Sequence, residues 1–379
     1  MEQTLGQRLA AMPNSLGVMT EIREFHIAID DADVEELEFR LARTRWTDQV
    51  PGAGSRYGDD VADVQELARY WAQDFDWRAV ERRLNSFPQF VTEIDGTNVH
   101  FLHVRSTNPE ALPLLLIHGW PGSVMEFVDV IEHLREDFHL VIPSIPGYGF
   151  SGPTTDTGWH SGRIARAFAE LMARLGYGRY GVHGNDAGSI IAPEVGRVGG
   201  EHVAGVHVTQ IFSFPSGDPA EMEGLTEDDF RRLGVLQNFW ENLSGYAKLQ
   251  QARPQNVAFA LADSPAGQLA WTMQLMGEPA VSKDFLLANV AIYWFTGTAG
   301  SSARLYFEDA HREDTPTEPT TFPMGVAIFA DDFQTIRRFA ERDHHNLVHW
   351  SEFGSGGHYS GHQVPELLAD DLKVYFAKI

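Results

Sequence analysis

The sequence has 379 residues, of which 43% are hydrophobic, and it carries a formal net charge of −24 with no cysteine. This length accommodates one large domain with insertions or two ordinary domains. The absence of cysteine excludes disulfides, thiolate metal ligands and a cysteine nucleophile. A strongly acidic chain repels phosphate backbones and anionic lipid surfaces, so we expect neither a nucleic-acid partner nor a membrane partner.

The chain shows no signal for membrane insertion or secretion. No apolar run reaches the roughly 18 residues that a membrane span requires, and the N-terminus lacks the charged-then-apolar order of a secretory signal. These observations predict a cytoplasmic protein. A homodimer is left open as its assembly.

The first part of the sequence predicts an N-terminal extension and helical arm over residues 1–87. Residues 1–20 form a loose extension. Apolar residues then recur at helical spacing in two segments, 30–43 and 62–76, which predicts two amphipathic helices. Because both helices precede any strand, we expect the arm to pack on a domain formed later in the chain.

From residue 88 the pattern indicates strands alternating with helices, which is typical of an α/β fold with a mostly parallel central sheet and helices on both faces. A hairpin turns at residues 95–97, and residues 161–175 form an amphipathic helix. The other expected strands cover 112–117, 138–142, 180–183, 203–208, 324–329 and 348–353. The core is therefore expected to consist of residues 88–211 and 321–379.

Residues 212–320 interrupt this rhythm with a helix-rich segment that contains many aromatic residues. The segment follows an expected strand, and ligands of α/β sheets bind at the carboxyl edge of the strands. We therefore expect a helical lid over that edge.

Residues 184–188 read Gly-Asn-Asp-Ala-Gly between a strand-like segment and an apolar helix-like segment. This is the pattern of a nucleophile elbow, in which a sharp strand-to-helix turn presents the central side chain, here Asp186. A carboxylate that attacks an acyl carbon gives a mixed anhydride, whereas attack on saturated carbon gives a stable ester that water can cleave. The elbow therefore favours a substrate with a leaving group on sp3 carbon, such as an epoxide or a halide.

The sequence also contains the other parts that such a site requires: a loop before the elbow, and an acid and a histidine after it. The loop His-Gly-Trp-Pro-Gly-Ser predicts an oxyanion hole formed by the backbone N–H groups of Trp120 and Ala187. His358, after the last strand, is the expected base, and Asp332 is favoured over Asp331 as the acid that orients it. No metal and no cofactor is expected, because His358 and His362 lack the surrounding motif of a zinc site.

These motifs resemble the epoxide hydrolases of the α/β-hydrolase superfamily, in the branch of the microsomal and juvenile-hormone enzymes and their bacterial relatives. The resemblance covers nearly the whole chain, from FHIAIDDADVEELEFRLARTRW through HGWPGSVMEF and YWFTGTAGSSARLYFED to NLVHWSEFGSGGHYSGHQVPELLADDLKVYF. It implies that Asp186 is the nucleophile, His358 the base and Asp332 the acid. It also implies that Tyr246 and Tyr306 donate hydrogen bonds to the epoxide oxygen.

The resemblance implies hydrolysis of a small-molecule epoxide to a vicinal diol through an ester on Asp186. The sequence departs from it at Asn185 and Ala187, where relatives often have Gly and Trp; the smaller Ala187 leaves room for a bulky hydrophobic substrate, such as an aryl or polycyclic epoxide. Natural-product biosynthesis and detoxification are both open as the physiological role. The alternatives are a haloalkane dehalogenase and a binding protein without catalysis.

Overall fold

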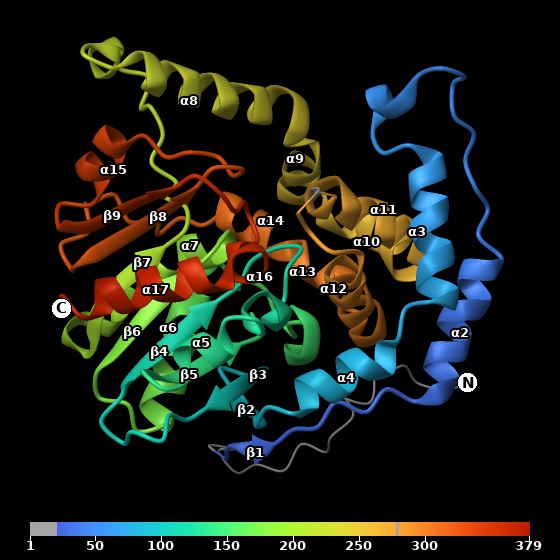
Figure 1. Cartoon of the computed structure of the whole chain (residues 1–379), viewed down its shortest axis with the longest axis horizontal. Helices are drawn as coiled ribbons and strands as arrows, with labels where there is room; N and C mark the ends of the chain where they lie inside the picture. The colour runs from blue at the N-terminus through green and yellow to red at the C-terminus, as the bar shows by residue number, and fades with distance from the viewer. Residues whose placement is uncertain (1–20, 278–279) are drawn as a thin grey trace.

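The computed structural model describes residues 21–277 and 280–379, so the N-terminal extension expected over residues 1–20 lies outside the described part. One nine-stranded sheet organises the chain, in the order β1-β2-β3-β5-β4-β6-β7-β8-β9 (Figure 1). The first three strands are antiparallel to their neighbours, and the pairs from β5 onward in this order are parallel. This is the α/β architecture with a mostly parallel sheet that the alternating pattern predicts, and it agrees with the α/β-hydrolase fold that the resemblance implies.

The predicted strands are present with small shifts at their ends. The hairpin consists of β2 (Gln89–Ile94) and β3 (Thr97–Val104). The short β1 (Arg23–Glu24), which pairs with β2, has no clear sequence signal. The remaining strands are β4 (Leu112–Ile117), β5 (Phe138–Pro143), β6 (Tyr180–Gly184), β7 (Val203–Val208), β8 (Met324–Phe329) and β9 (Leu347–Phe353).

Helices cover both faces of the sheet, which explains why its central strands read as continuous apolar runs. In β4, Leu114 and Leu116 belong to one core cluster, while Leu115 and Ile117 belong to the other. Helices α5 (Ile131–Leu134) and α17 (Pro365–Phe376) contribute to the first cluster, and α6 (Ser161–Arg174) and α7 (Ala187–Gly199) contribute to the second. Alternate side chains of one strand thus fill two separate cores.

Between β7 and β8 the chain forms a group of helices beside the sheet (Figure 1). Helix α8 projects along the top of the view and buries none of its side chains. The longer helices are α8 (Glu227–Asn238), α9 (Gly245–Ala252), α10 (Pro254–Asp263), α11 (Pro265–Met276) and α12 (Lys283–Thr296), followed by the short α13 (Ala299–Ser302) and α14 (Arg304–Ala310).

The N-terminal helices α2 (Asp31–Ala42) and α3 (Val61–Gln73) pack against α11 of this group. A third helix, α4 (Trp77–Asn85), was not predicted; it follows the predicted segment 62–76, which the structure gives as α3. Asp76 begins the new helix by accepting a hydrogen bond from the backbone N–H of Ala79, which is a typical N-cap. Among the described residues, no helix is both long enough and apolar enough to cross a bilayer.

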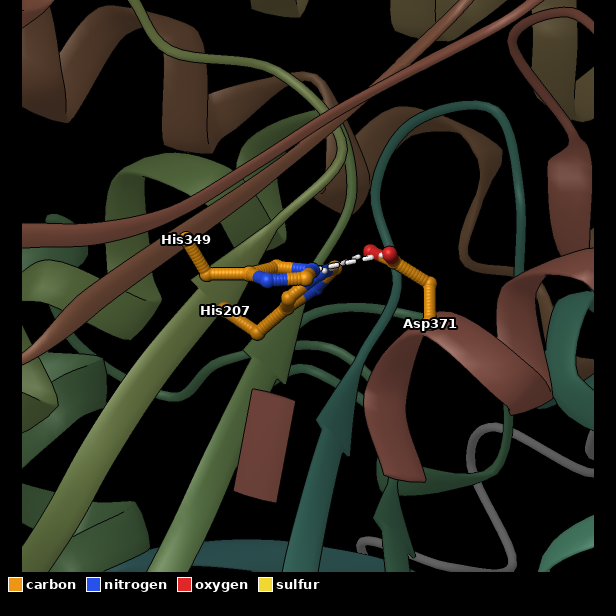
Figure 2. Close-up of side chains that lie close together, drawn as sticks. All are labelled: His207, His349 and Asp371. Carbon is orange, nitrogen blue, oxygen red and sulfur yellow. Dashed lines mark hydrogen bonds and ion pairs between the residues drawn. The ribbon is translucent and has the colours of Figure 1, made fainter. Parts of the chain in front are cut away.

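A buried polar network joins two strands to the last helix (Figure 2). Nε2 of His207 on β7 lies 2.9 Å from Asp371 Oδ2, and Nε2 of His349 on β9 lies 2.8 Å from Asp371 Oδ1. Lys378 Nζ lies 2.7 Å from His349 Nδ1. Since an ammonium group can only donate, His349 Nδ1 accepts and its Nε2–H donates to Asp371.

The side chains of His207, His349 and Asp371 lie close enough together to hold a metal ion. Among the described residues, they are the group of histidines and acids with such spacing. However, the tautomer that Lys378 imposes on His349 leaves no lone pair on the nitrogen that faces Asp371. Burial would raise the pKa of Asp371, but hydrogen bonds from His207, Ser351 and His349 outweigh burial and lower it. The arrangement is thus a network around a buried carboxylate that ties α17 to the sheet.

Candidate active site

Asp186 lies at the sharp turn between β6 and α7, with φ of 52° and ψ of −121°. A non-glycine residue rarely adopts positive φ, and such strain costs on the order of 1–3 kcal/mol. The flanking glycines make the turn possible: a Cβ on Gly184 would lie 2.0 Å from the carbonyl oxygen of Gly188, and one on Gly188 would lie 2.0 Å from that of Ile117. The sequence pattern of the elbow therefore corresponds to a real steric requirement.

The two oxygens of the Asp186 carboxylate have different partners. Oδ1 accepts a hydrogen bond of 2.8 Å from the backbone N–H of Trp120, and Oδ2 lies 3.6 Å from His358 Nε2. Burial raises the pKa of Asp186, while the charge of His358 and the backbone N–H groups of Trp120 and Ala187 oppose that rise. Both N–H groups expected in the oxyanion hole thus act on this carboxylate.

His358 lies between two carboxylates. Its Nδ1 is 3.4 Å from Asp332 Oδ1, opposite the side that faces Asp186. Burial would lower the pKa of His358, but the charges of Asp332, Asp186 and Glu126 and a hydrogen bond to Asp332 raise it to about 10. The imidazole is therefore positively charged at neutral pH.

Of the two adjacent acids, Asp332 is the one whose carboxylate faces the histidine. Asp331 instead donates its backbone N–H to the carbonyl oxygen of Gly356. Gln210, the second residue after β7, donates from Nε2 to Asp332 Oδ2 at 2.6 Å, and its Nε2 lies 3.0 Å from His358 Nδ1. Gln210 was not predicted, although its place at the carboxyl end of a parallel strand is a usable signal.

Two tyrosines from the helical group lie at this site and pack against the Trp120 ring. Tyr246 of α9 stacks on the Trp120 ring with centroids 5.2 Å apart, and Tyr306 of α14 meets that ring edge-on at 5.9 Å. Burial raises the pKa of both phenols, and the charge of Asp186 raises it further. Both phenols are thus protonated at neutral pH and can donate hydrogen bonds.

The structure adds two side chains that the sequence analysis did not assign to the site. Glu126, in the short helix η2 (Val124–Phe127), is 1% exposed, and its Oε1 accepts a bond of 2.5 Å from Asn185 Nδ2. Asn185 Nδ2 also donates to the backbone carbonyl of His358 at 2.8 Å. The available signal was an acid inside the apolar segment Val-Met-Glu-Phe-Val, since a lone carboxylate rarely lies in a core without a partner.

Two further histidines lie outside this group of side chains. The His118 imidazole is buried and lies between the Gly119 carbonyl and the Ile145 backbone N–H. The His362 Nδ1 lies 2.7 Å from Asp129 Oδ2, and its ring stacks on Phe285. In the described part of the chain, neither imidazole is hydrogen-bonded or ion-paired to Asp186.

The chain is similar to known proteins over most of its length. Residues 22–127 match the family model "Epoxide hydrolase N terminus", and residues 113–255 match "alpha/beta hydrolase fold". A Stigmatella aurantiaca protein whose name also places it among the epoxide hydrolases is 38% identical over 94% of this chain and 85% of its own length. "Epoxide hydrolase 1" of Sus scrofa is 30% identical, with 93% of this chain and 88% of the relative covered.

Similarity to solved structures extends over the same length. The structure of Aspergillus niger epoxide hydrolase superposes with a TM-score of 0.86 at 29% sequence identity, covering 95% of this chain and 97% of that chain. The similarity includes the N-terminal helices, the sheet and the helical group, because so little of either chain is left unmatched.

Proposed function

This chain belongs to the epoxide hydrolases, and we propose that it opens a hydrophobic epoxide in two covalent steps with Asp186 as the nucleophile. The observation that carries the proposal is the position of the Asp186 carboxylate. One of its oxygens is held by a backbone N–H, and the other lies near His358. Two protonated phenols pack on the Trp120 ring beside it.

The first step forms an ester. Asp186 Oδ2 attacks an epoxide carbon, the carbon–oxygen bond of the ring breaks, and Tyr246 or Tyr306 donates its proton to the departing oxygen. Oδ1 remains in the oxyanion hole and becomes the carbonyl oxygen of the ester. The product of this step is a hydroxyalkyl ester together with a tyrosinate.

Ester formation also prepares the base for the second step. The carboxylate charge of Asp186, which contributes to the raised pKa of His358, disappears when the ester forms. The imidazolium can then pass its proton to the tyrosinate, which restores the phenol and leaves neutral His358. A single loss of charge thus converts His358 from an acid into a base.

In the second step His358, oriented by Asp332, removes a proton from water, and the hydroxide attacks the carbonyl carbon of the ester. The N–H groups of Trp120 and Ala187 stabilise the resulting oxyanion. When the intermediate collapses, the leaving alkoxide takes the proton of the new carboxylic acid. A vicinal diol is released, and the site returns to an Asp186 carboxylate and a His358 imidazolium.

The aromatic wall indicates the substrate class. Trp120, Tyr246 and Tyr306 present ring faces and edges to one another beside the carboxylate. Such a wall favours an epoxide with an apolar or aromatic substituent, because aromatic contacts add to the free energy of burying apolar surface. Styrene oxide and its alkyl counterparts are suitable test substrates.

The covalent route can be tested by trapping the ester. In His358→Gln the first step remains possible and the second loses its base, so one equivalent of substrate should be consumed and then retained. Mass spectrometry of a digest should find the substrate mass on the peptide that contains Asp186, and the Asp186→Asn variant should carry none. Continued turnover by His358→Gln with no modified peptide would contradict this function.

A further inference from the structure

Glu126 is a buried ionisable group next to the site that the two steps above do not use. It lies in η2, after the loop that carries Trp120, and its carboxyl group is in contact with the elbow through Asn185. Its second oxygen, Oε2, lies so close to Gly122 that a Cβ there would be 2.8 Å away. The carboxyl group therefore lies between the loop that carries Trp120 and the side chain of Asn185, the residue before Asp186.

Glu126 also contacts the loop that carries His358. A Cβ on Gly361 would lie 2.5 Å from the Glu126 backbone carbonyl oxygen. The Asn185 side-chain amide also links Glu126 to the loop that carries His358, because its Nδ2 donates both to Glu126 and to the backbone carbonyl oxygen of His358. Thr209, after β7, donates to Asn185 Oδ1 at 2.5 Å.

These bonds use both hydrogens of the Asn185 amide group and fix the orientation of its side chain. The residue directly after Asn185 is the proposed nucleophile, and the carbonyl it holds belongs to the proposed base. A group that fixes Asn185 therefore acts on both partners of the reaction without touching the substrate.

We propose that Glu126 is a positioning residue for ester hydrolysis, which holds Asn185 so that the His358 loop stays in register with the nucleophile elbow. This inference rests on the covalent route proposed above. The effect should be larger on hydrolysis than on ester formation, since His358 acts as a base only in the second step. Asn185 is one of the positions at which this sequence departs from the pattern it resembles.

The charge state of Glu126 supports a role of this kind. Burial raises its pKa to about 8, although the Asn185 hydrogen bond and the charge of His358 oppose the rise. The ionisable groups that act on it or respond to it are Asp186, His358 and the Tyr293 phenol. Burial and the charge of Asp186 thus disfavour a third negative charge near His358, while the Glu126 carboxyl oxygen accepts the Asn185 bond in either protonation state.

The test is a set of single-turnover measurements on the full chain that separate ester formation from ester hydrolysis, with styrene oxide as the probe. Glu126→Leu removes the acceptor, Glu126→Gln keeps an oxygen that can accept from Asn185, and Asn185→Ala removes the link itself. Asp371→Asn, in the buried network behind the sheet, controls for loss of stability at a carboxylate outside the site.

We expect Glu126→Leu and Asn185→Ala each to slow hydrolysis more than tenfold and ester formation less than threefold. The double variant should be no slower than either single variant, and Glu126→Gln should restore hydrolysis at pH 7. Because the Glu126 carboxylate raises the pKa of His358, the pH at which hydrolysis reaches half its maximal rate should be lower in Glu126→Gln than in wild type.

Hydrolysis within threefold of wild type in Glu126→Leu would overturn the inference, as would a loss that Glu126→Gln does not reverse. The same holds if Asp371→Asn slows hydrolysis as much as Glu126→Leu. If instead the wild-type enzyme forms no ester at all, the covalent route itself fails, so the two failures can be told apart.

Discussion

At the residue scale, the reactivity that we propose for Asp186 depends on the different environments of its two oxygens. Trp120 N–H holds Oδ1, which leaves Oδ2 to attack carbon without breaking that hydrogen bond. Burial raises the pKa of the carboxylate and so makes its charged form more basic, while the charge of His358 and the backbone N–H groups of Trp120 and Ala187 oppose that rise. In the mechanism that we propose, the site thus combines a desolvated nucleophile with a preformed oxyanion hole.

The two tyrosines are predicted to act on the first step. Tyr246→Phe or Tyr306→Phe removes one donor to the epoxide oxygen, and a hydrogen bond to developing charge is worth about 1.5–3 kcal/mol. Each single variant should therefore form the ester roughly 10–100-fold more slowly. Rapid-quench measurement of ester formation tests this.

The hydrolysis rate serves as the internal control for these variants, since it should change less than ester formation. The double Phe variant should be slower than either single variant, because it leaves the oxygen without a phenol donor. Ester formation at the wild-type rate in the double variant would contradict the role of both phenols.

The residues of the site differ in how well the sequence predicts them. Asp186 could be located because its turn requires glycine at two fixed positions, and His358 and Asp332 because they follow strands of a parallel sheet. Tyr246 and Tyr306 came only from family resemblance, since a tyrosine on a lid helix has no pattern of its own. Glu126 and Gln210 were missed because their importance lies in contacts between segments distant in the chain.

At the element scale, the buried network around Asp371 fixes α17 on the sheet. His207 and His349 come from two strands, and Asp371 accepts from both. Ser351 donates to the same carboxylate at 2.5 Å. Removing the buried carboxylate leaves the groups that donate to it without an acceptor, which lowers the free energy of unfolding by about 3–5 kcal/mol.

Asp371→Asn should therefore lower the free energy of unfolding by about 3 kcal/mol at pH 7. The adjacent Asp370 is exposed and serves as the matched control, for which Asp370→Asn should have little effect. Denaturant titration of both variants measures the difference. Equal stability of the two variants would show that the network does not hold α17.

The stability difference between wild type and Asp371→Asn should depend on pH, and the pKa of Asp371 gives the direction of that dependence. The folded-state pKa of Asp371 lies below its ordinary value of about 3.9. Its stabilisation is therefore complete above that ordinary value and is lost as pH falls toward the folded-state pKa. The gap in stability between wild type and Asp371→Asn should narrow in acid, and a gap that widens would contradict the assignment.

At the scale of the whole molecule, the fold could be predicted because its local and global signals agree. Apolar runs of six residues that alternate with amphipathic helices predict a parallel sheet covered on both faces, and β4 divides its side chains between two cores accordingly. The short β1 and helix α4 were not predicted. A two-residue edge strand has no period, and α4 is a nine-residue helix in which only Trp77 and Leu84 are buried.

The net charge of −24 predicts how the molecule responds to salt. The 29 basic side chains can pair with only part of the 53 acidic ones, so the excess negative charge repels itself across the surface. Raising NaCl from ~0.01 M to ~1 M shortens the Debye length from ~30 Å to ~3 Å and screens that repulsion.

The melting temperature should therefore rise by about 1–2 °C over this range, which corresponds to roughly 1 kcal/mol for a chain of this size. Differential scanning calorimetry at pH 7 measures the change. An equal rise in an uncharged osmolyte would assign the effect to exclusion from the surface, and a fall with NaCl would show that surface ion pairs outweigh the repulsion.

The central claim is that a carboxylate oxygen of Asp186, rather than one from water, first enters the product. It is tested most directly by a single turnover in H2(18)O with enzyme in excess over the epoxide. Our account predicts that the first diol carries an unlabelled oxygen from Asp186 and that the label appears in the peptide that contains Asp186. Label found directly in the diol, with an unlabelled Asp186 peptide, would contradict it.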